Sequence, residues 1–495
     1  MKNTKQPNAR RQNGISSGAL NQMKKVMTVS VVLFGVAAMS SGAHAAEQQA
    51  TAERPNILFI YLDDFGWKDT GYMGSDFYET PNLDRLAKEG MIFTDAYSNA
   101  ANCAPARACL LSGQYTPRHK IFNVGSKPRG SAKHRRLMIP NLETALDEEV
   151  VTWGEILQEK GYRTGMFGKW HVGADPTTQG FDVAVEYNKL PGNNGHYGPH
   201  GEYLADRLTD RTIKFIEESK EEPWCAYLAH FGVHTPLHPK KDLLPKYEAK
   251  KPGELHNHVI MATMIQAIDD GVGRLVETLD RLGERENTVI VFSSDNGGYG
   301  PATDMDPLWG YKGTYFEGGI RVPLFVNWPK VVKPGSRSDE PVIGVDFFPT
   351  FCGIAGSDLP KQPVDGRSLL PLLRGETETF GERPIYWHFP AYLQSYEVYG
   401  EQRDPLFRSR PVGVIRVGDY KLKEYFEDGK IVIYDLKKDI RERNDLAETM
   451  PEKRDELYRQ LREWQKEVGA PRPTALNPKF DAEAERKAIE KALAK

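Results

Sequence analysis

Several residues that can bind a cation or move a proton stand directly after short apolar runs of the sequence. They are two pairs of oxygen ligands, a lysine and two histidines: Asp63, Asp64, Lys169, His171, His234, Asp295 and Asn296. In an open parallel sheet such positions fall at the carboxyl ends of the strands, where ligands bind. Carboxylate and amide oxygens suit Ca²⁺ or Mg²⁺ better than zinc. Either dipeptide alone is more simply a strand end entering a turn, but the two together favour a cation site.

Three cations among or near these residues are candidates for holding an anion: Arg107, Lys169 and Lys312. Arginine gives forked hydrogen bonds to a tetrahedral oxyanion, and lysine gives a mobile point charge. Each of them alone is more commonly a solvated surface charge. The imidazoles of His171 and His234 suit general acid or base chemistry. Four further histidines could line the same predicted site at the strand ends: His119, His196, His200 and His238.

The segment NCAPARACLLSGQY, residues 102–115, places a cysteine, Cys103, where a helix is predicted to begin. A thiol at a helix start is either buried filler or a reactive group, and the segment alone leaves both readings open. The chain has four cysteines in all: Cys103, Cys109, Cys225 and Cys352. An oxidising compartment would favour disulfides, but the sequence assigns no pairing.

Alternating apolar runs and amphipathic segments predict the elements that position these side chains. Five runs are typical of buried strands in a parallel sheet: residues 56–62, 162–167, 223–230, 288–294 and 322–328. Between them, residues 80–90, 203–218 and 261–282 have helical spacing, with Thr80 as N-cap and Pro81 in the first turn of the first helix. Strands alternating with helices predict an α/β fold with a large mixed, mostly parallel sheet flanked by helices.

The pattern changes after about residue 360 to short strands joined by turns at Gly418-Asp419 and Asp428-Gly429, which predicts an antiparallel sheet. Residues 450–469 then predict one amphipathic helix with four inward residues: Leu457, Leu461, Trp464 and Val468. We therefore expect a main domain at 52–360, a smaller C-terminal α+β subdomain at 361–475 and a charged tail at 476–495, either helical or frayed.

The first 45 residues have a basic start, an apolar middle and a small-residue end, which predicts a signal peptide cleaved after Ala45. The apolar run is too short for stable membrane insertion. The leader carries six of the 65 basic residues and none of the 68 acidic ones, so the remaining chain has a formal charge near −9. That balance disfavours a nucleic-acid partner and requires local positive charge to hold an anionic substrate. We expect export to the periplasm or the extracellular space.

Seven ordered blocks resemble the type I sulfatase family of the alkaline-phosphatase-like superfamily. The sequence CAPAR at 103–107 matches the C-x-P-x-R signature, and ACLLSGQY follows it. The segment beginning NILFIYLDDFGW resembles the family's N-terminal metal-site block, and GYRTGMFGKWHVG, FGVHTPLHP, VIVFSSDNGG and YKGTYFEGGIRVP resemble later ones. The resemblance covers most of residues 54–350, and the general layout resembles bacterial polysaccharide-degrading members, including N-acetylgalactosamine-6-sulfatase-like ones.

The resemblance implies that a maturation enzyme, formylglycine-generating or sulfatase-maturating, converts Cys103 to formylglycine (3-oxoalanine). One hydroxyl of the hydrated aldehyde would attack sulfur, and the second would allow sulfate to be expelled. One Ca²⁺ per chain would be held by Asp63, Asp64, Asp295, Asn296 and the modified Cys103. The implied roles of the other site residues are proton donation to the leaving oxygen by His234 with Lys312, base catalysis by His171, and support of the modified residue by Arg107 and Lys169, with Lys169 also reaching sulfate.

The function expected from this resemblance is exo-acting hydrolysis of sulfate esters on a sulfated carbohydrate. Two alternatives stay open: a phosphonate or phosphate ester hydrolase of the same superfamily, and a non-catalytic Ca²⁺-dependent carbohydrate-binding protein. We expect the sugar to be selected by variable loops at 118–140, 185–202 and 385–410. Aromatic residues at 388–400 could stack on sugar faces or belong to the core of the second domain, and the sequence favours neither.

Overall fold

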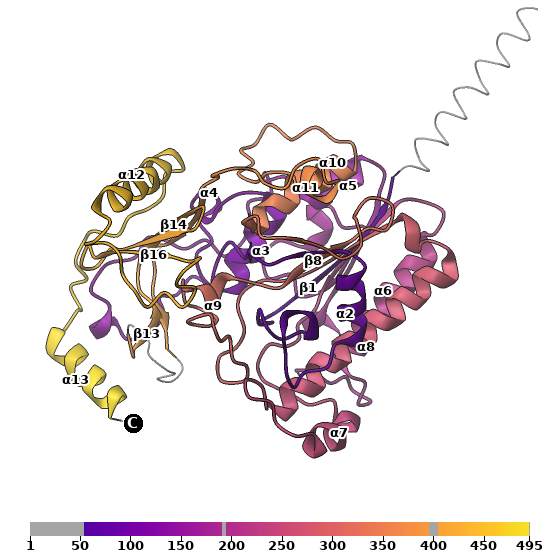
Figure 1. The fold of residues 1–495 in the computed structure, drawn as a ribbon, viewed down its shortest axis with the longest axis horizontal. Helices are drawn as coiled ribbons and strands as arrows, with labels where there is room; N and C mark the ends of the chain where they lie inside the picture. The colour runs from indigo at the N-terminus through magenta and orange to yellow at the C-terminus, as the bar shows by residue number, and fades with distance from the viewer. Residues whose placement is uncertain (1–53, 191–194, 396–403, 495) are drawn as a thin grey trace, which may run out of the picture. The chain divides into compact units, whose positions relative to one another are not determined.

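An eight-stranded sheet forms the centre of the main domain (Figure 1). The computed structural model describes residues 54–190, 195–395 and 404–494, so the predicted signal peptide lies outside the described residues. Across the sheet the strands follow the order β5-β4-β6-β1-β7-β8-β2-β9. Their bounds are β1 (Asn56–Leu62), β2 (Met91–Phe93), β4 (Arg163–Gly168), β5 (Val183–Glu186), β6 (Trp224–Ala229), β7 (Thr288–Ser294), β8 (Leu324–Asn327) and β9 (Ser336–Ser338).

The strand directions confirm a mixed, mostly parallel sheet. Strands β5, β4, β6, β1 and β7 pair in parallel, as do β2 and β9. Strand β8 is antiparallel to both β7 and β2, so the expectation that residues 322–328 form a parallel strand is wrong. A parallel connection needs a long crossover, usually a helix. Between β7 and β8 the chain forms only the four-residue helix α9 (Glu317–Ile320), and it re-enters the sheet from the edge where β7 ended.

The two faces of the sheet bury two separate sets of apolar residues. Along β1, the side chains of Ile57, Phe59 and Tyr61 join one core cluster, whereas the alternating Leu58, Ile60 and Leu62 join the other. This alternation follows from the two-residue period of a strand. Because both faces are covered, the strand is a continuous apolar run rather than an alternating one.

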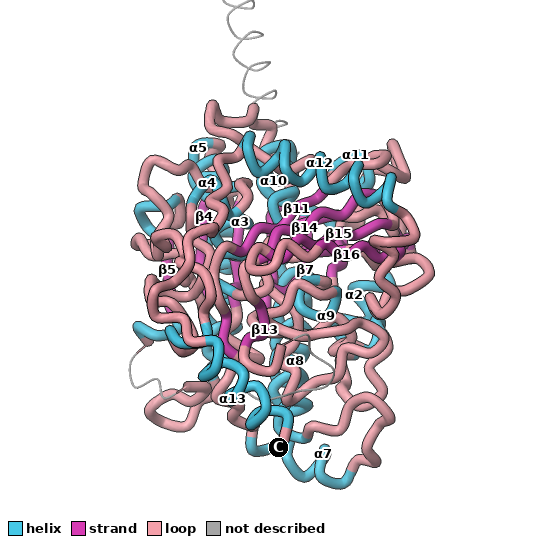
Figure 2. The backbone as a smooth tube through the Cα atoms, turned by 90° about the vertical axis from the view of Figure 1, so that its left-hand side faces the viewer, coloured by secondary structure: helices cyan, strands magenta, loops and turns pink. Residues whose placement is uncertain are grey.

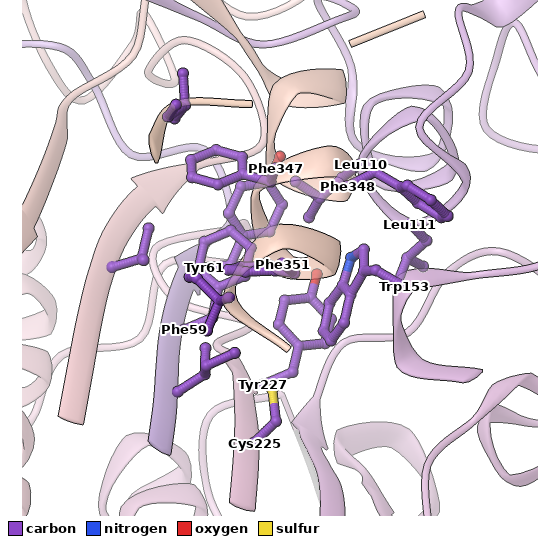
Figure 3. Packing of buried hydrophobic residues seen from close by; sticks show 14 of the residues in the cluster. Phe59, Tyr61, Leu110, Leu111, Trp153, Cys225, Tyr227, Phe347, Phe348 and Phe351 are labelled. Atoms are coloured by element: carbon purple, nitrogen blue, oxygen red, sulfur yellow. The ribbon is translucent and has the colours of Figure 1, made fainter. Parts of the chain in front are cut away.

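Helices cover each face. The second cluster contains residues of α2 (Pro81–Lys88), α6 (Leu204–Ser219) and α8 (Val259–Leu282), which lie together on one side of the sheet in Figure 1. On the other face are α3 (Cys103–Ser112), α5 (Trp153–Glu159) and α10 (Phe347–Ile354). Figure 3 shows the aromatic contacts there, where the ring centroid of Phe59 lies 5.1 Å from that of Phe347. These contacts hold the helices against the strands whose ends carry the site.

The C-terminal subdomain has the predicted antiparallel sheet. Its strands are β11 (Ile385–Phe389), β14 (Val412–Val417), β15 (Tyr420–Tyr425) and β16 (Ile431–Asp435), paired in that order (Figure 2). Helix α12 (Pro451–Glu467) packs against this sheet. Its Leu457, Leu461 and Trp464, with Val468 just after it, share one hydrophobic cluster with apolar residues of the strands. A short sheet of β12 (Leu393–Gln394) and β13 (Phe407–Ser409) adjoins it. The indole of Trp387, in β11, donates a hydrogen bond to the Ser98 carbonyl at 2.8 Å and links the four-stranded sheet to the main domain.

The tail ends in a helix, α13 (Ala482–Leu493), whose N-terminus is capped by the Asp481 side chain. All four cysteines are buried and unpaired. Among the described helices, none combines the length and the apolar composition that crossing a membrane requires.

Candidate active site

The ends of β1 and β7 bring the two oxygen-ligand pairs together. Leu62 and Ser294 are register partners in the parallel pair, so Asp63-Asp64 and Asp295-Asn296 leave the sheet side by side. The backbone N–H of Asp64 donates to Asp295 Oδ1 at 3.3 Å, and Asn296 Nδ2 donates to Asp64 Oδ1 at 2.9 Å. Asp64 adopts a left-handed φ of 63°, a conformation that Asp tolerates better than most residues and that turns the chain sharply at the strand end.

Strand β4 delivers Lys169 and His171 to the same edge. Gly168 has a φ of 121°, and a Cβ there would lie 1.9 Å from the Ala229 carbonyl oxygen, so only glycine permits this approach of β4 to β6. The next backbone N–H, that of Lys169, donates to the same carbonyl at 2.6 Å. The Lys169 ammonium then forms a buried ion pair with Asp63. The end of β4 therefore sets the distance between a lysine and a carboxylate of β1.

Helix α3 contributes Cys103 at its first residue and Arg107 one turn later, on the same helix face. Arg107 is fully buried, and it donates from Nε to Asp295 Oδ2 at 2.9 Å and from Nη1 to the Lys169 carbonyl at 2.8 Å. Its Nη2 lies 2.8 Å from the same Asp295 oxygen. Arg107 thus ties the helix to the ends of β4 and β7. Its fork is occupied by a carboxylate of the protein, and the side chain lies behind the cavity wall.

Lys312 and His234 both approach the Oδ2 atom of Asp64. Lys312 Nζ donates to Asp64 Oδ2 at 2.6 Å, and His234 Nε2 lies 3.8 Å from that oxygen. His234 Nδ1 lies 2.6 Å from the Thr235 carbonyl, which can only accept, so Nδ1 carries a proton. Nε2 is therefore the nitrogen of His234 that is left to exchange a proton with a ligand.

The donor set fits a divalent cation. Asp63, Cys103 and Asp295 offer ligand atoms within 4.8 Å of one another, and so do Asp63, Asp64 and His234. Within this cluster, Asp63 Oδ1 and Asn296 Oδ1 are buried and have no hydrogen-bond partner in the described residues. Buried polar atoms are almost always satisfied. The two unpartnered oxygens, in a cluster of hard ligands, are what a site built for Ca²⁺ or Mg²⁺ would present.

Charge and burial shift the proton affinities of the cluster. Burial, and next the neighbouring Asp63 carboxylate, raise the pKa of Asp295 well above its usual value. Burial also acts to raise the pKa of Asp63, but the Lys169 ammonium and the other cations around it hold that pKa below its ordinary value. Crowded carboxylates of this kind repel one another unless cations neutralise them. Burial, together with the charge of Lys169, lowers the pKa of His171 to about 3, so its imidazole is neutral at physiological pH.

A cavity of about 390 Å³ opens over this cluster. It is lined by five of the residues that the sequence predicts for the site: Cys103, Lys169, His171, His234 and Lys312. Sequence reasoning did not single out the residues that complete its wall, among them Asn102, Asn123, Arg129, Tyr187, Phe231 and Arg408. Four of these six belong to the three loops expected to select the sugar, so the loop positions carried a usable signal although the individual residues did not.

Other expectations around the cavity are not met. The four additional histidines do not line it. His119 is buried beside Cys109, with Nε2 3.3 Å from the sulfur, and His196 Nε2 lies 3.0 Å from the His234 carbonyl. In the stretch 388–400, Phe389 and Tyr392 belong to the buried core, whereas Tyr396 and Tyr399 lie outside the described residues.

Comparisons with known proteins agree with this geometry. Residues 55–357 match the family model described as Sulfatase, and residues 308–468 match the one described as N-sulphoglucosamine sulphohydrolase, C-terminal. The chain is 32% identical to a Sulfatase of Formosa agariphila, over 91% of this chain and 95% of that protein. It is 27% identical to the N-acetylglucosamine-6-O-sulfatase of Bacteroides thetaiotaomicron, over 92% and 93%. A solved structure of Ps i-CgsB in complex with k-i-k-neocarrahexaose is similar with a TM-score of 0.70 and 29% identity, over 83% of this chain and 92% of that one.

Proposed function

The chain belongs to the sulfatase family, and from this premise we propose that it hydrolyses sulfate esters on a sulfated saccharide. The observation that carries the proposal is the convergence of Cys103, Lys169, His171, His234 and Lys312 on one cavity above a cluster of cation ligands. The names of its relatives include saccharide sulfatases, and one similar structure holds an oligosaccharide. Cleavage from the end of a saccharide chain, the exo-acting mode, is part of the proposal.

Modification of Cys103 is the second part of the proposal. Cys103 lies at the N-terminus of α3 and in the cavity wall, in the C-x-P-x-R sequence that a maturation enzyme would read. As formylglycine, its hydrated aldehyde would supply one hydroxyl as the nucleophile and a second whose deprotonation releases sulfate. The first turn of α3 adds backbone N–H groups and the positive end of a helix dipole, which favour an anion.

Asp63, Asp64, Asp295 and Asn296, with the modified Cys103, would hold one Ca²⁺. When bound, such a cation supplies Lewis-acid polarisation of a hydroxyl and of a sulfate oxygen. Arg107 keeps Asp295 oriented through its two contacts with Oδ2. Lys169 and Lys312 hold Asp63 and Asp64 while presenting their ammonium groups to the cavity, where they attract sulfate.

The two histidines divide the proton transfers. His234 donates Nδ1–H to the Thr235 carbonyl and presents Nε2 to the cavity. As the imidazolium it carries a second proton on Nε2, and it donates that proton to the leaving oxygen of the alcohol. Lys312, on the same side of Asp64, supports that role. His171, neutral because its pKa is near 3, can accept a proton in the step that releases sulfate.

Export completes the proposal. The leader at 1–45 would direct the protein to the periplasm or beyond the cell, where polysaccharides are degraded. The proposal also divides the chain into three parts: a catalytic domain at 52–360, a C-terminal subdomain at 361–475 and a tail at 476–495.

The test is desulfation of a panel of defined sulfated saccharides by protein whose Cys103 peptide has been weighed by mass spectrometry. We expect the aldehyde mass, release of inorganic sulfate, and no turnover by Cys103→Ala. Matching phosphate and phosphonate esters are assayed in parallel. Faster cleavage of those esters would favour the phosphoester alternative. Aldehyde-bearing protein that binds saccharides but releases no sulfate would contradict the proposal.

A further inference from the structure

One segment of the chain is far more basic than the rest. Residues 118–136 contain no Asp or Glu, although acidic residues outnumber basic ones in the whole chain, 68 to 65. The basic residues of the segment are Arg118, Lys120, Lys127, Arg129, Lys133, Arg135 and Arg136, with His119 and His134. Arg118 is paired with Asp365. The remaining cations concentrate positive charge on one loop.

The protein leaves this charge unneutralised. In the part of the chain that the structure describes, no carboxylate forms an ion pair with the side chain of Lys127, Arg129, Lys133, Arg135 or Arg136. Glu427 accepts a hydrogen bond from the Arg136 backbone N–H at 3.4 Å, but its carboxylate is also bonded to the Tyr392 hydroxyl and to Arg410 Nη1, the latter at 2.8 Å. The carboxylate of Asp481, whose backbone N–H donates to the Lys133 carbonyl, accepts from the Ala484 N–H as a helix cap. An uncompensated basic surface attracts anions from solution.

The C-terminal tail holds this loop in one shape. Asn477 Nδ2 donates to the carbonyls of Ala132 and Arg135, at 2.9 and 2.7 Å. The backbone N–H groups of Asn477 and Asp481 donate to the carbonyls of Arg136 and Lys133. In Figure 1 the tail helix α13 lies at the left beside this short violet segment. The cations of the loop are therefore presented on a braced backbone.

The basic loop separates the active-site cavity from a second hollow. Arg129 lines the active-site cavity, whereas its neighbour Pro128 lines the second hollow, of about 500 Å³. Consecutive Cα atoms are about 3.8 Å apart, so the two hollows meet at this ridge. Arg135 lines the second hollow and donates from Nη1 to the Arg129 carbonyl across the ridge.

The lining of the second hollow combines charge with apolar surface. Arg135 and Lys479 are its two cationic residues, and both lack a carboxylate partner in the described chain. The other walls include Met138, which is 49% exposed, and Pro478. Apolar side chains suit the C–H faces of sugar rings, and the cations suit sulfate groups attached to them. A lone inorganic ion would not require a hollow of this size.

We propose that the ridge and the second hollow bind further sulfated units of the substrate, so that the preferred substrate is a multiply sulfated saccharide of several sugars. The proposal rests on the proposed sulfatase function. One sulfate group enters the active-site cavity, the chain passes Arg129, and a neighbouring sulfated unit meets Arg135 and Lys479. Residues 477–479 of the tail thereby become part of the substrate-binding surface.

The test is a binding measurement in the inactive Cys103→Ala protein by titration calorimetry. The probes are sulfated isomaltose, sulfated isomaltohexaose, unsulfated isomaltohexaose and hexaglutamate. We expect the sulfated hexasaccharide to bind at least tenfold more tightly than the sulfated disaccharide. Arg135→Gln with Lys479→Gln should weaken hexasaccharide binding by about five- to tenfold and leave disaccharide binding unchanged, as expected for one half-buried and one exposed charge. Arg135→Lys, which keeps the positive charge, should retain most of the hexasaccharide affinity that Arg135→Gln loses.

Lys330→Gln with Lys333→Gln is the matched control, because these exposed lysines follow β8 at the opposite edge of the sheet. It should leave all affinities unchanged. Lys479→Gln alone removes a side chain that makes no bond in the described structure, so its smaller loss cannot be ascribed to misfolding. Equal binding of the two sulfated saccharides, unchanged binding by the double variant, or equally tight binding of hexaglutamate would overturn the proposal. Absence of sulfate release by the matured wild-type protein would instead refute the proposed function, since binding is measured without turnover.

Discussion

At the scale of single residues, the site is organised by buried pairs of opposite charge. Arg107 and Asp295 are both fully buried, and Lys169 and Lys312 each contact one of the two aspartates that follow β1. A buried ion pair is costly to form and more costly to break, because the surviving partner is left unpaired in a medium of low dielectric. We therefore expect each of these side chains to matter for stability as well as for the proposed chemistry.

Replacing Asp295 with Asn tests the cation assignment. The change keeps the shape but removes one ligand charge and the partner of Arg107, so we expect loss of bound metal and a fall in rate of about 10³-fold. The unpaired Arg107 should lower the free energy of unfolding by about 3 kcal/mol or more. Metal analysis after dialysis, turnover and denaturation would measure the three effects.

The control is Asp346→Asn, which breaks a buried pair with Arg383 away from the site. It should lower stability in a similar way and leave metal content and turnover per folded molecule intact. Full metal content and full rate in Asp295→Asn would refute the assignment.

Replacing His234 with Ala tests the proton donor. A leaving alcohol of high pKa needs a proton at its oxygen, whereas an activated phenolate does not. We expect turnover of a saccharide or alkyl sulfate to fall by about 10²- to 10⁴-fold and that of an activated aryl sulfate to change much less. Exposed His200→Ala should change neither rate. Equal losses on both classes of ester would count against the role.

At the scale of elements, strand ends set the geometry. The parallel register of β1 with β7 aligns the two oxygen-ligand pairs, and the close approach of β4 to β6 at Gly168 positions Lys169. The antiparallel return of β8 keeps the intervening residues, which include Lys312, at the same edge. These relations between strands do not involve the loops expected to select the sugar, at 118–140, 185–202 and 385–410.

Replacing Gly168 with Ala tests the element that carries Lys169. The new Cβ would lie 1.9 Å from the Ala229 carbonyl, at a φ of 121° that L side chains avoid. We expect the free energy of unfolding to fall by about 3 kcal/mol or more, with a loss of activity as Lys169 shifts. Chemical denaturation and turnover would measure both.

Gly283→Ala is the control, because Gly283 also has a positive φ, of 73°, but no atom lies within 4 Å of the added Cβ. It should cost about 1 kcal/mol, the usual strain of that conformation. Similar losses in the two variants would show that the contact between β4 and β6 is not tight.

At the scale of the whole molecule, buried neutral histidines couple stability to pH. Burial lowers the pKa of His119 and of His230 to about 3, and burial, partly offset by a hydrogen bond to the Pro471 carbonyl, lowers that of His388 to about 4. In the unfolded chain these groups titrate near pH 6.5. Between pH 6.5 and about 4 the unfolded chain therefore binds protons that the folded chain does not, so stability falls as the pH falls.

His230→Phe tests this coupling. Neither ring nitrogen of His230 has a partner in the described structure, so an apolar ring of similar shape should be tolerated. Each buried histidine contributes up to about 1.4 kcal/mol per pH unit in this window. We expect the denaturant concentration at the midpoint of unfolding to be lower at pH 5 than at pH 7 for the wild type. The decrease should be smaller for His230→Phe. Exposed His200→Phe should keep the wild-type slope, and an unchanged slope in His230→Phe would contradict the account.

The sequence by itself was sufficient for the elements whose signal is local. The runs at 56–62 and 288–294 match β1 and β7 residue for residue, because strands buried on both faces are continuous apolar runs. The inward face of α12 followed from helical spacing. The oxygen ligands Asp63, Asp64, Asp295 and Asn296 were predicted because they stand directly after such strands, and the ordered motifs of a known family supported the same positions.

Only the tertiary structure decided what depends on partners distant in sequence. Strands β2, β5 and β9 are short and became strands through their neighbours, and the antiparallel direction of β8 follows from where the chain re-enters the sheet. Two long-range contacts have no local pattern: Arg107 binds Asp295, 188 residues away, and the tail binds the basic segment 118–136 at its residues 132–136. A sequence records which groups are available, but which of them meet is decided by packing that buries apolar surface throughout the fold.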